Sequence, residues 1–233
     1  MTTLPRQNPS RSRADEPLGP GERRPTSHER RSGNPWEASY LEGPAPWDIG
    51  RPQPAVVRLA AEGGFAGAVL DVGCGTGENT LHIAGRGLEV LGVDVAPTAL
   101  ALARAKAAAR GVRAEFAQAD ALRLQRLRRK FRTVLDCGLF HTLDDAERRT
   151  YVAGLASVTE GGGTLYVLSF SDEGADTGPH PVAREHLGAA FEPVTGWEVA
   201  SIEPDRLRTR FHGEDGAPAW LATIKRLSAS RRP

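Results

Sequence analysis

Residues 68–94 read AVLDVGCGTGENTLHIAGRGLEVLGVD, and this stretch decides the fold. The apolar run at 68–72 has the length and β-branching of a buried strand. Glycines at alternate positions over 73–77 predict a turn too tight for side chains, and a helical stretch follows at 79–86. A second buried strand over 90–94 closes the unit, which must cross over right-handed to a parallel neighbour. We therefore expect an α/β fold with a nucleoside site at the turn, because backbone N–H groups and a strand-end carboxylate meet there.

The spacing of the glycines distinguishes two classes of nucleoside-binding protein. Residues 73–77 follow G-x-G-x-G, whereas the dinucleotide fingerprint G-x-G-x-x-G would need glycine where Glu78 stands. Asp71 precedes the turn by two residues, and Asp94 ends the second strand. Together these features resemble motif I of the class I S-adenosylmethionine-dependent methyltransferases, in which an acid at the position of Asp94 binds the ribose. A nucleotide-dependent oxidoreductase is the rival class, and Glu78 disfavours it.

Composition restricts the class of protein further. A chain of 233 residues is long enough for one domain with a full core. Its net charge of +1 argues against a nucleic-acid binder that works by electrostatics. No apolar run has the length of a membrane span or forms a signal-peptide core, and Cys74 and Cys137 lie at strand ends rather than in a disulfide framework. We expect a cytoplasmic monomer or homodimer with no metal, membrane or nucleic-acid partner.

The N-terminal part of the chain divides into two segments. Residues 1–34 are rich in Pro, Arg, Ser and Gly with almost no apolar content, which predicts a disordered tail. An arginine arm that touches RNA or an acidic partner is the alternative for this tail. The predicted domain covers 35–230, and its first part, 35–63, comprises an irregular segment and a helix. The irregular segment carries Trp36, Tyr40 and Trp47. These aromatic side chains either form a lid over the site or cap the apolar end of the sheet.

The rest of the chain predicts the remaining strands and helices. Strands are expected at 115–119, 133–136 and 164–169, with helices after Pro97, after a capping box of Asp144 and Glu147, and around 185–190. The basic run over 123–132 is interpreted as a solvated connection rather than a phosphate contact. Segments 197–210 and 217–226 alternate as a hairpin. We therefore expect an α/β, Rossmann-like fold that resembles that of the class I methyltransferases: a mixed seven-stranded sheet with a terminal antiparallel hairpin and helices on both faces.

Four segments carry a closer resemblance: PWDIGRPQP (46–54), VLDVGCGTGENTLHIA (69–84), TVLDCGLFHTLDD (133–145) and PAWLATIKR (218–226). They are similar to actinobacterial small-molecule methyltransferases, including the heterocyclic toxin methyltransferases of the thiopurine-methyltransferase-like group. Arg132 departs from the pattern, since such sequences usually carry Asp there. The resemblance implies S-adenosyl-L-methionine as the cofactor. It implies as cofactor-binding residues Trp47, Asp71, Gly73, Cys74, Gly75, Gly77, Asp94, Val95, Asp120, Ala121, Asp136 and Cys137.

The implied activity is transfer of a methyl group to oxygen or nitrogen of a small aromatic or heterocyclic acceptor. The expected acceptor-binding residues are Trp36, Tyr40, Phe140 and His141. His141 is the candidate general base, because an unperturbed imidazole titrates near neutral pH; a purely structural role is the alternative. The alternative functions are methylation of RNA or protein, or cofactor binding without catalysis. A small molecule is favoured because residues 136–139 read DCGL, where base-modifying enzymes often carry Asn/Asp-Pro-Pro-aromatic.

Overall fold

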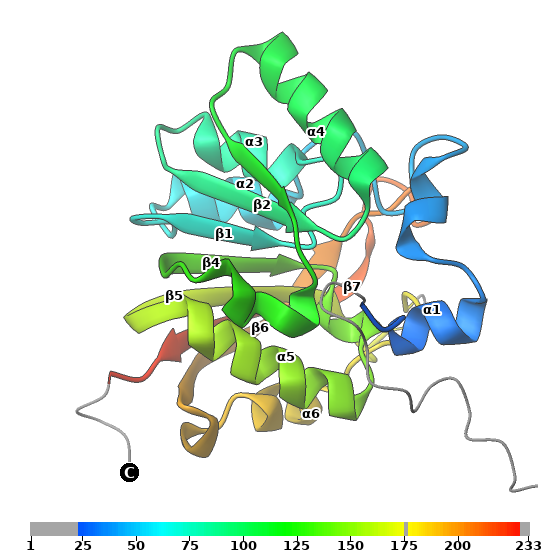
Figure 1. The fold of residues 1–233 in the computed structure, drawn as a ribbon. Coiled ribbons are helices and arrows are strands. Elements are labelled where there is room, and N and C mark those ends of the chain that lie inside the picture. The colour runs from blue at the N-terminus through cyan, green and yellow to red at the C-terminus, as the bar shows by residue number, and fades with distance from the viewer. Residues whose placement is uncertain (1–22, 175–176, 229–233) are drawn as a thin grey trace, which may run out of the picture.

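The computed structural model describes residues 23–174 and 177–228. Its centre is a seven-stranded sheet in the order β3-β2-β1-β4-β5-β7-β6 (Figure 1). The strands are β1 (Val69–Val72), β2 (Val90–Asp94), β3 (Glu115–Gln118), β4 (Phe131–Cys137), β5 (Thr159–Phe170), β6 (Trp197–Leu207) and β7 (Ala217–Arg226). The first five strands pair in parallel, and β7 is antiparallel to both β5 and β6. The predicted mixed sheet with a closing hairpin is confirmed.

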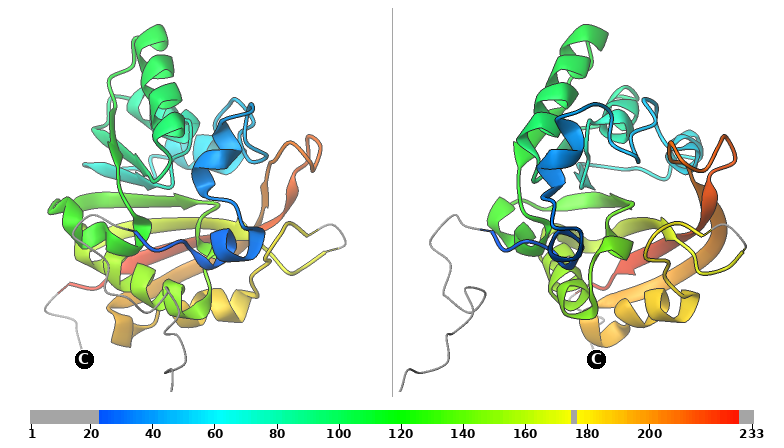
Figure 2. Two further views of the ribbon diagram at one scale, coloured as in Figure 1. Left: turned by 45° about the vertical axis from the view of Figure 1, so that its right-hand side comes forward. Right: turned by 90° about the vertical axis from the view of Figure 1, so that its right-hand side faces the viewer.

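Helices cover both faces of the sheet (Figures 1 and 2). On one face lie α2 (Pro54–Ala61), α3 (Glu78–Ala84) and α4 (Pro97–Arg110); the other face carries α5 (Asp145–Val158) and α6 (Arg184–Ala190). Short 3-10 turns are η2 (Trp36–Tyr40), η3 (Ala121–Leu127), η4 (Phe140–Thr142) and η5 (Pro193–Thr195). Because side chains alternate along a strand, Val69 packs in the cluster with α2 and α3, while Leu70 packs in the cluster with α5. Among the described residues, no helix is long and apolar enough to cross a membrane.

One boundary differs from the prediction at the start of β5. The strand predicted at 164–169 begins earlier, at Thr159 directly after α5 ends at Val158, so the glycines at 161–163 lie within β5. The pairing of β5 with β4 shifts register there. A Cβ atom on Gly163 would come within 2.9 Å of the Arg132 carbonyl oxygen, so the irregular strand requires glycine at this position.

The N-terminal boundary at residue 35 needs a correction. Residues 27–32 form a helix, α1 (Ser27–Ser32), which begins with a capping box formed by Thr26 and Glu29. Ser27 then donates its backbone N–H and its hydroxyl to the two carboxylate oxygens of Glu147, each at 2.6 Å. The segment has little apolar surface to bury, but these polar contacts fix it to α5. The remainder of the predicted disordered tail, residues 1–22, lies outside the described residues.

The N-terminal segment lies at the carboxyl ends of the parallel strands. Figures 1 and 2 show α1 and η2 crossing this edge of the sheet, and the loop between β6 and β7 approaches the same edge from the other side. Ligands of open α/β sheets bind at this edge. The fold therefore gathers chain segments far apart in sequence around the place where the glycine turn predicted a site.

Candidate active site

The glycine turn forms the floor of the site. Gly73, Gly75 and Gly77 all have positive φ angles, of 72°, 53° and 82°. Gly77 caps α3, and a Cβ atom there would come within 2.9 Å of Ala103 and 3.0 Å of Phe116. Glycine is therefore required both by the backbone conformation and by the close packing of α4 against the turn.

Asp94 closes the turn from the neighbouring strand. Its two carboxylate oxygens accept the backbone N–H groups of Gly75 and Ala96, each at 2.9 Å. Each oxygen keeps a further acceptor position. Burial raises the pKa of Asp94, and the hydrogen bonds from Ala96 and Gly75 oppose that rise. The carboxylate faces a cavity, so its free acceptor positions are accessible to the ribose hydroxyls that it is predicted to bind.

The cavity, of about 440 Å³, lies at the carboxyl edge of the parallel strands. Ligand pockets commonly measure about 300–1,000 Å³. The predicted cofactor residues that line it are Trp47, Gly73, Cys74, Gly75, Asp94, Val95, Asp120, Ala121 and Cys137. Asp120 caps η3 by accepting the Leu122 N–H at 2.9 Å, which places this acid and Ala121 at the end of β3. The fold thus brings predicted cofactor-binding residues from the ends of four strands, β1 to β4, to one cavity.

Three predicted cofactor residues do not line the cavity. Gly77 ends the turn as the N-cap of α3, where it packs against Ala103 and Phe116. Asp71 is buried and accepts the Thr80 hydroxyl at 2.6 Å, which ties β1 to α3. Asp136 is also buried and accepts the Tyr151 hydroxyl at 2.9 Å and the backbone N–H of Leu139 at 3.0 Å. Both acids support the strand ends from beneath rather than from the cavity wall.

The aromatic segment 35–51 forms a wall of this cavity. Trp47 donates its indole N–H to the Tyr40 hydroxyl at 2.9 Å, and the Trp36 and Trp47 rings meet edge to face with centroids 5.4 Å apart. Asp48 accepts the Thr76 hydroxyl at 2.6 Å, which fastens the segment to the glycine turn. The segment therefore lines the cavity, and its role as a lid stays a prediction.

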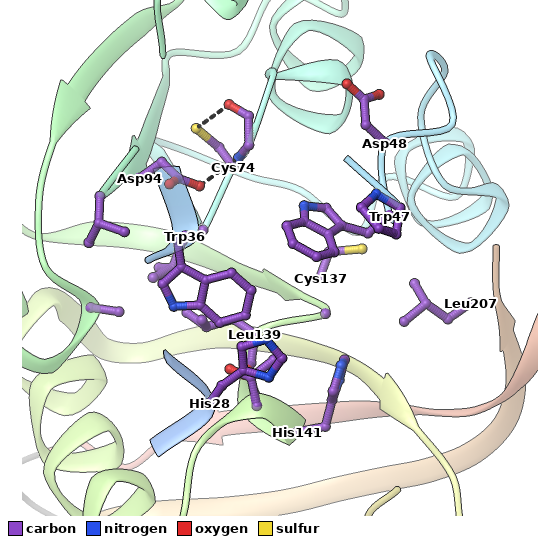
Figure 3. Close-up of a pocket in the computed structure, with 18 of the residues that line it drawn as sticks. His28, Trp36, Trp47, Asp48, Cys74, Asp94, Cys137, Leu139, His141 and Leu207 are labelled. Atoms are coloured by element: carbon purple, nitrogen blue, oxygen red, sulfur yellow. Dashed lines mark hydrogen bonds between the residues drawn. The ribbon is translucent and has the colours of Figure 1, made fainter. Parts of the chain in front are cut away.

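His141 and Phe140 are neighbours in η4 with opposite environments. His141 lines the cavity and contacts the Phe170 ring, with centroids 4.6 Å apart. Figure 3 shows its ring pointing into the pocket between Leu139 and Leu207. Phe140 does not reach the cavity: it is fully buried against Phe191. The prediction that Phe140 binds the acceptor therefore needs a correction, because its ring packs in the core and does not line the cavity.

The environment of His141 also bears on its predicted role as a base. Its Nδ1 atom is buried and has no hydrogen-bond partner among the described residues. Burial, together with the smaller effects of nearby His180, Arg148 and His28, lowers the pKa of His141 to about 3. An imidazole with this pKa is neutral at physiological pH but is a weak proton acceptor. The placement of His141 fits contact with an acceptor better than deprotonation of one.

Sequence reasoning missed several residues that line the same cavity. Thr26 and His28 come from the segment that was expected to be disordered, and His180 and His212 come from loops without a motif. One signal could have found the first two: Thr26 is followed three residues later by Glu29, the spacing of a capping box, which predicts a helix start. The loop residues have no comparable local pattern. Within the described part of the chain, no cluster of three or more His, Cys, Asp or Glu side chains could hold a metal ion.

Comparison with known proteins connects this geometry to a family. A family model described as a methyltransferase domain matches residues 69–163. Over 205 residues the chain is 34% identical to 2-heptyl-1-hydroxyquinolin-4(1H)-one methyltransferase of Mycobacteroides abscessus, an alignment that covers 83% of this chain and 89% of that protein. The chain belongs to the S-adenosylmethionine-dependent methyltransferase family.

Two further comparisons agree with this membership. A solved structure from work on the conversion of a disulfide bond into a thioacetal group during echinomycin biosynthesis is 38% identical to this methyltransferase, with a TM-score of 0.71, and the match covers 79% of this chain and 87% of that one. Probable thiol methyltransferase 2 of Arabidopsis thaliana is 28% identical over 176 residues, which cover 74% of this chain and 77% of that protein. Both the fold class and the S-adenosylmethionine cofactor of the sequence prediction are confirmed.

The electrostatics of the methyltransferase cavity suit a cationic cofactor. Asp71, Asp94 and Asp136 end or nearly end three adjacent strands, and all three are buried. Burial raises the pKa of Asp71 to about 7 and that of Asp136 to about 6. A positive charge nearby stabilises the ionised form of such carboxyl groups. A sulfonium or ammonium group in the cavity would therefore stabilise the ionised form of these buried carboxyl groups.

Proposed function

We propose that this methyltransferase transfers a methyl group to oxygen or nitrogen of a small aromatic or heterocyclic acceptor. The observation that carries the proposal is the aromatic wall of the cavity, formed by Trp36, Trp47, Tyr40 and Phe170. Flat rings stack on such side chains and bury a large area with few polar contacts. The relative in M. abscessus is named for a hydroxyquinolinone, which is a flat heterocycle of this kind.

The proposed division of the cavity follows the strand ends. Backbone N–H groups of the 73–77 turn are assigned to the amino-acid end of the cofactor, Asp94 to its ribose hydroxyls, and Asp120 with Ala121 to its adenine. When bound, S-adenosylmethionine supplies an electrophilic methyl group on a sulfonium. The Tyr40 and Trp47 rings would face that cation and keep water away from it. The remaining end, around His141 and Phe170, is left for the acceptor.

Two observations support a small acceptor over RNA or protein. Segments from both ends of the domain, 26–51 and 207–212, contribute to the cavity wall and cover it. The basic run is partly neutralised away from the cavity: Arg129 pairs with Glu89 at 2.8 Å and with Glu115 at 2.6 Å. We therefore propose a small-molecule reaction without nucleic acid, membrane or metal, carried out by a cytoplasmic monomer or homodimer.

A thiol acceptor is the second candidate. The observation that favours it is the similarity to probable thiol methyltransferase 2 of A. thaliana. A thiolate is already nucleophilic and needs alignment rather than a base. The aromatic wall does not require a thiol, so hydroxyl and ring-nitrogen acceptors remain the primary proposal.

An acceptor panel tests the proposal. The purified full chain is incubated with S-adenosylmethionine and 1-hydroxyquinolin-4-ones, substituted phenols, aromatic thiols or total RNA, and products are identified by mass spectrometry. We expect O- or N-methylated aromatic products with the wild type and loss of product with Asp94→Ala. Methylated RNA with no methylated small molecule would overturn the proposal, and products from thiols alone would replace it by the second candidate.

A further inference from the structure

Two histidines from distant parts of the chain meet at the acceptor end of the cavity. His28 lies on α1, and His180 lies in the loop between β5 and α6. His28 Nδ1 and His180 Nε2 are 3.4 Å apart, and the two rings are nearly perpendicular with centroids separated by 5.5 Å. Both side chains line the cavity. The pair therefore forms only because α1 docks on the domain.

The surroundings hold the pair in place. The His28 ring stacks on Trp36, with centroids 4.4 Å apart and an interplanar angle of 10° (Figure 3). His180 has a φ angle of 55°, and among the described residues only one other non-glycine residue, Arg128, has a positive φ. Such backbone conformations cost free energy and collect at functional sites. Stacking on Trp36 fixes the His28 ring, and the constrained backbone fixes the position of His180. Neither ring is part of the hydrophobic core.

The two rings differ in their exposure to solvent. His28 is half-buried, whereas His180 is exposed. With Nδ1 of His28 directed at Nε2 of His180, each ring has one other nitrogen, His28 Nε2 and His180 Nδ1, that makes no hydrogen bond within the described residues. The two rings thus form a continuous contact from the cavity wall to solvent.

The charged groups around the pair favour the neutral form of both rings. Arg31 on α1 and Arg148 on α5 are the nearby cations, and both disfavour protonation. Glu29 on α1 favours it, but its carboxylate is already bonded to Arg23, Thr26 and the Trp36 backbone. His141 on η4, the third imidazole, is fully buried. Within the described part of the chain no carboxylate is hydrogen-bonded to either ring of the pair. Burial lowers the pKa of both histidines, so at neutral pH both rings are neutral and can accept a proton.

We propose that His28 and His180 are the proton-accepting pair of the reaction, and that the preferred acceptors carry a weakly acidic hydroxyl or ring N–H. This inference rests on the proposed function. The acceptor O–H bond breaks as His28 Nε2 takes the proton, and the acceptor oxygen forms its bond to the methyl carbon while the sulfur–carbon bond breaks. His28 passes its Nδ1 proton to His180, which releases one to water. The sulfonium becomes a neutral thioether, and no oxidant or reductant is needed.

Phenols of graded acidity test this role. At about pH 8, 4-nitrophenol is largely ionised, whereas 4-methylphenol, whose pKa is close to the ~10 of tyrosine, is not. His28→Gln and His180→Gln should each lower kcat for 4-methylphenol by roughly 10²–10⁴, the usual contribution of general base catalysis. For 4-nitrophenol, which needs no base, the loss should stay below about threefold. The variants should also regain rate as the pH rises toward the pKa of the phenol.

Controls separate this role from packing and from the proposed function. His186→Gln, an exposed histidine on α6, is the matched variant and should behave as wild type. Calorimetric affinity for S-adenosylmethionine should be unchanged in all three variants. Equal losses for both phenols, or none, would overturn the pair, and transfer of the pH dependence to His141→Gln alone would assign the base to His141. Failure of every small acceptor in the panel would instead contradict the proposed function, and the inference with it.

Discussion

Docking of α1 on α5 gives a prediction whose size follows from the contacts. Ser27→Ala removes the hydroxyl that donates to Glu147 at 2.6 Å and leaves the backbone N–H bond to the other carboxylate oxygen in place. A hydrogen bond to a charged group contributes about 1.5–3 kcal/mol. Because the backbone bond of Ser27 and the Arg30 bond to Glu147 at 3.2 Å both remain, we expect the lower end, about 1.5 kcal/mol, which corresponds to roughly tenfold more frequent opening of α1.

Hydrogen–deuterium exchange measures this opening directly. The Arg30 and Gly33 amides donate within the helix to Thr26 and Glu29 carbonyl oxygens, at 2.9 Å each, and are protected only while α1 is formed. Peptides covering 23–34 should exchange roughly tenfold faster in Ser27→Ala. Ser32→Ala, in the same helix but without a contact to Glu147, is the control and should change exchange far less. An unchanged rate in Ser27→Ala would refute the reasoning that polar contacts with Glu147 hold α1 on the domain.

Three further predictions follow from the site. Asp94→Ala should weaken S-adenosylmethionine binding at least about tenfold in calorimetry, because hydrogen bonds to a charged acceptor contribute about 1.5–3 kcal/mol each; unchanged affinity would contradict the ribose assignment. Deletion of residues 1–34 should lower the melting temperature more than deletion of residues 1–22, since only the longer deletion removes the contacts of Ser27, and equal effects would argue against docking. Burial lowers the pKa of His141 to about 3, below its usual 6.5, so the unfolded state binds more protons between those values and the free energy of unfolding should fall as the pH drops below about 6.5. Denaturation curves of His141→Gln should show a shallower fall; an identical pH dependence would mean that His141 is not buried in the neutral form.

The part of the fold predicted from sequence is the part specified by local patterns. The glycine turn, the apolar strands around it and the capping box at Asp144 are each encoded within a few residues, and each lies where the sequence predicted. Parallel strands with both faces covered read as continuous apolar runs, so β1 could be recognised without any tertiary information.

The part that sequence did not predict depends on contacts between distant residues. Ser27 and Glu147 are separated by 120 positions, and this polar contact between distant residues joins α1 to the domain. Composition therefore indicated disorder for a tail whose described part contains a docked helix. The orientation of η4 is a similar case. Phe140 and His141 are adjacent, and only the packing of the completed domain decides that one faces the core and the other the cavity.

The most direct test of the central claim follows the methyl group itself. Wild-type protein is incubated with S-adenosylmethionine carrying a trideuterated methyl group and with a 1-hydroxyquinolin-4-one, and both products are quantified by mass spectrometry. We expect the trideuteromethyl group on the acceptor in an amount equal to the S-adenosylhomocysteine formed. S-adenosylhomocysteine without labelled acceptor, across hydroxyquinolinones and phenols alike, would contradict methyl transfer to a small aromatic molecule in this cavity.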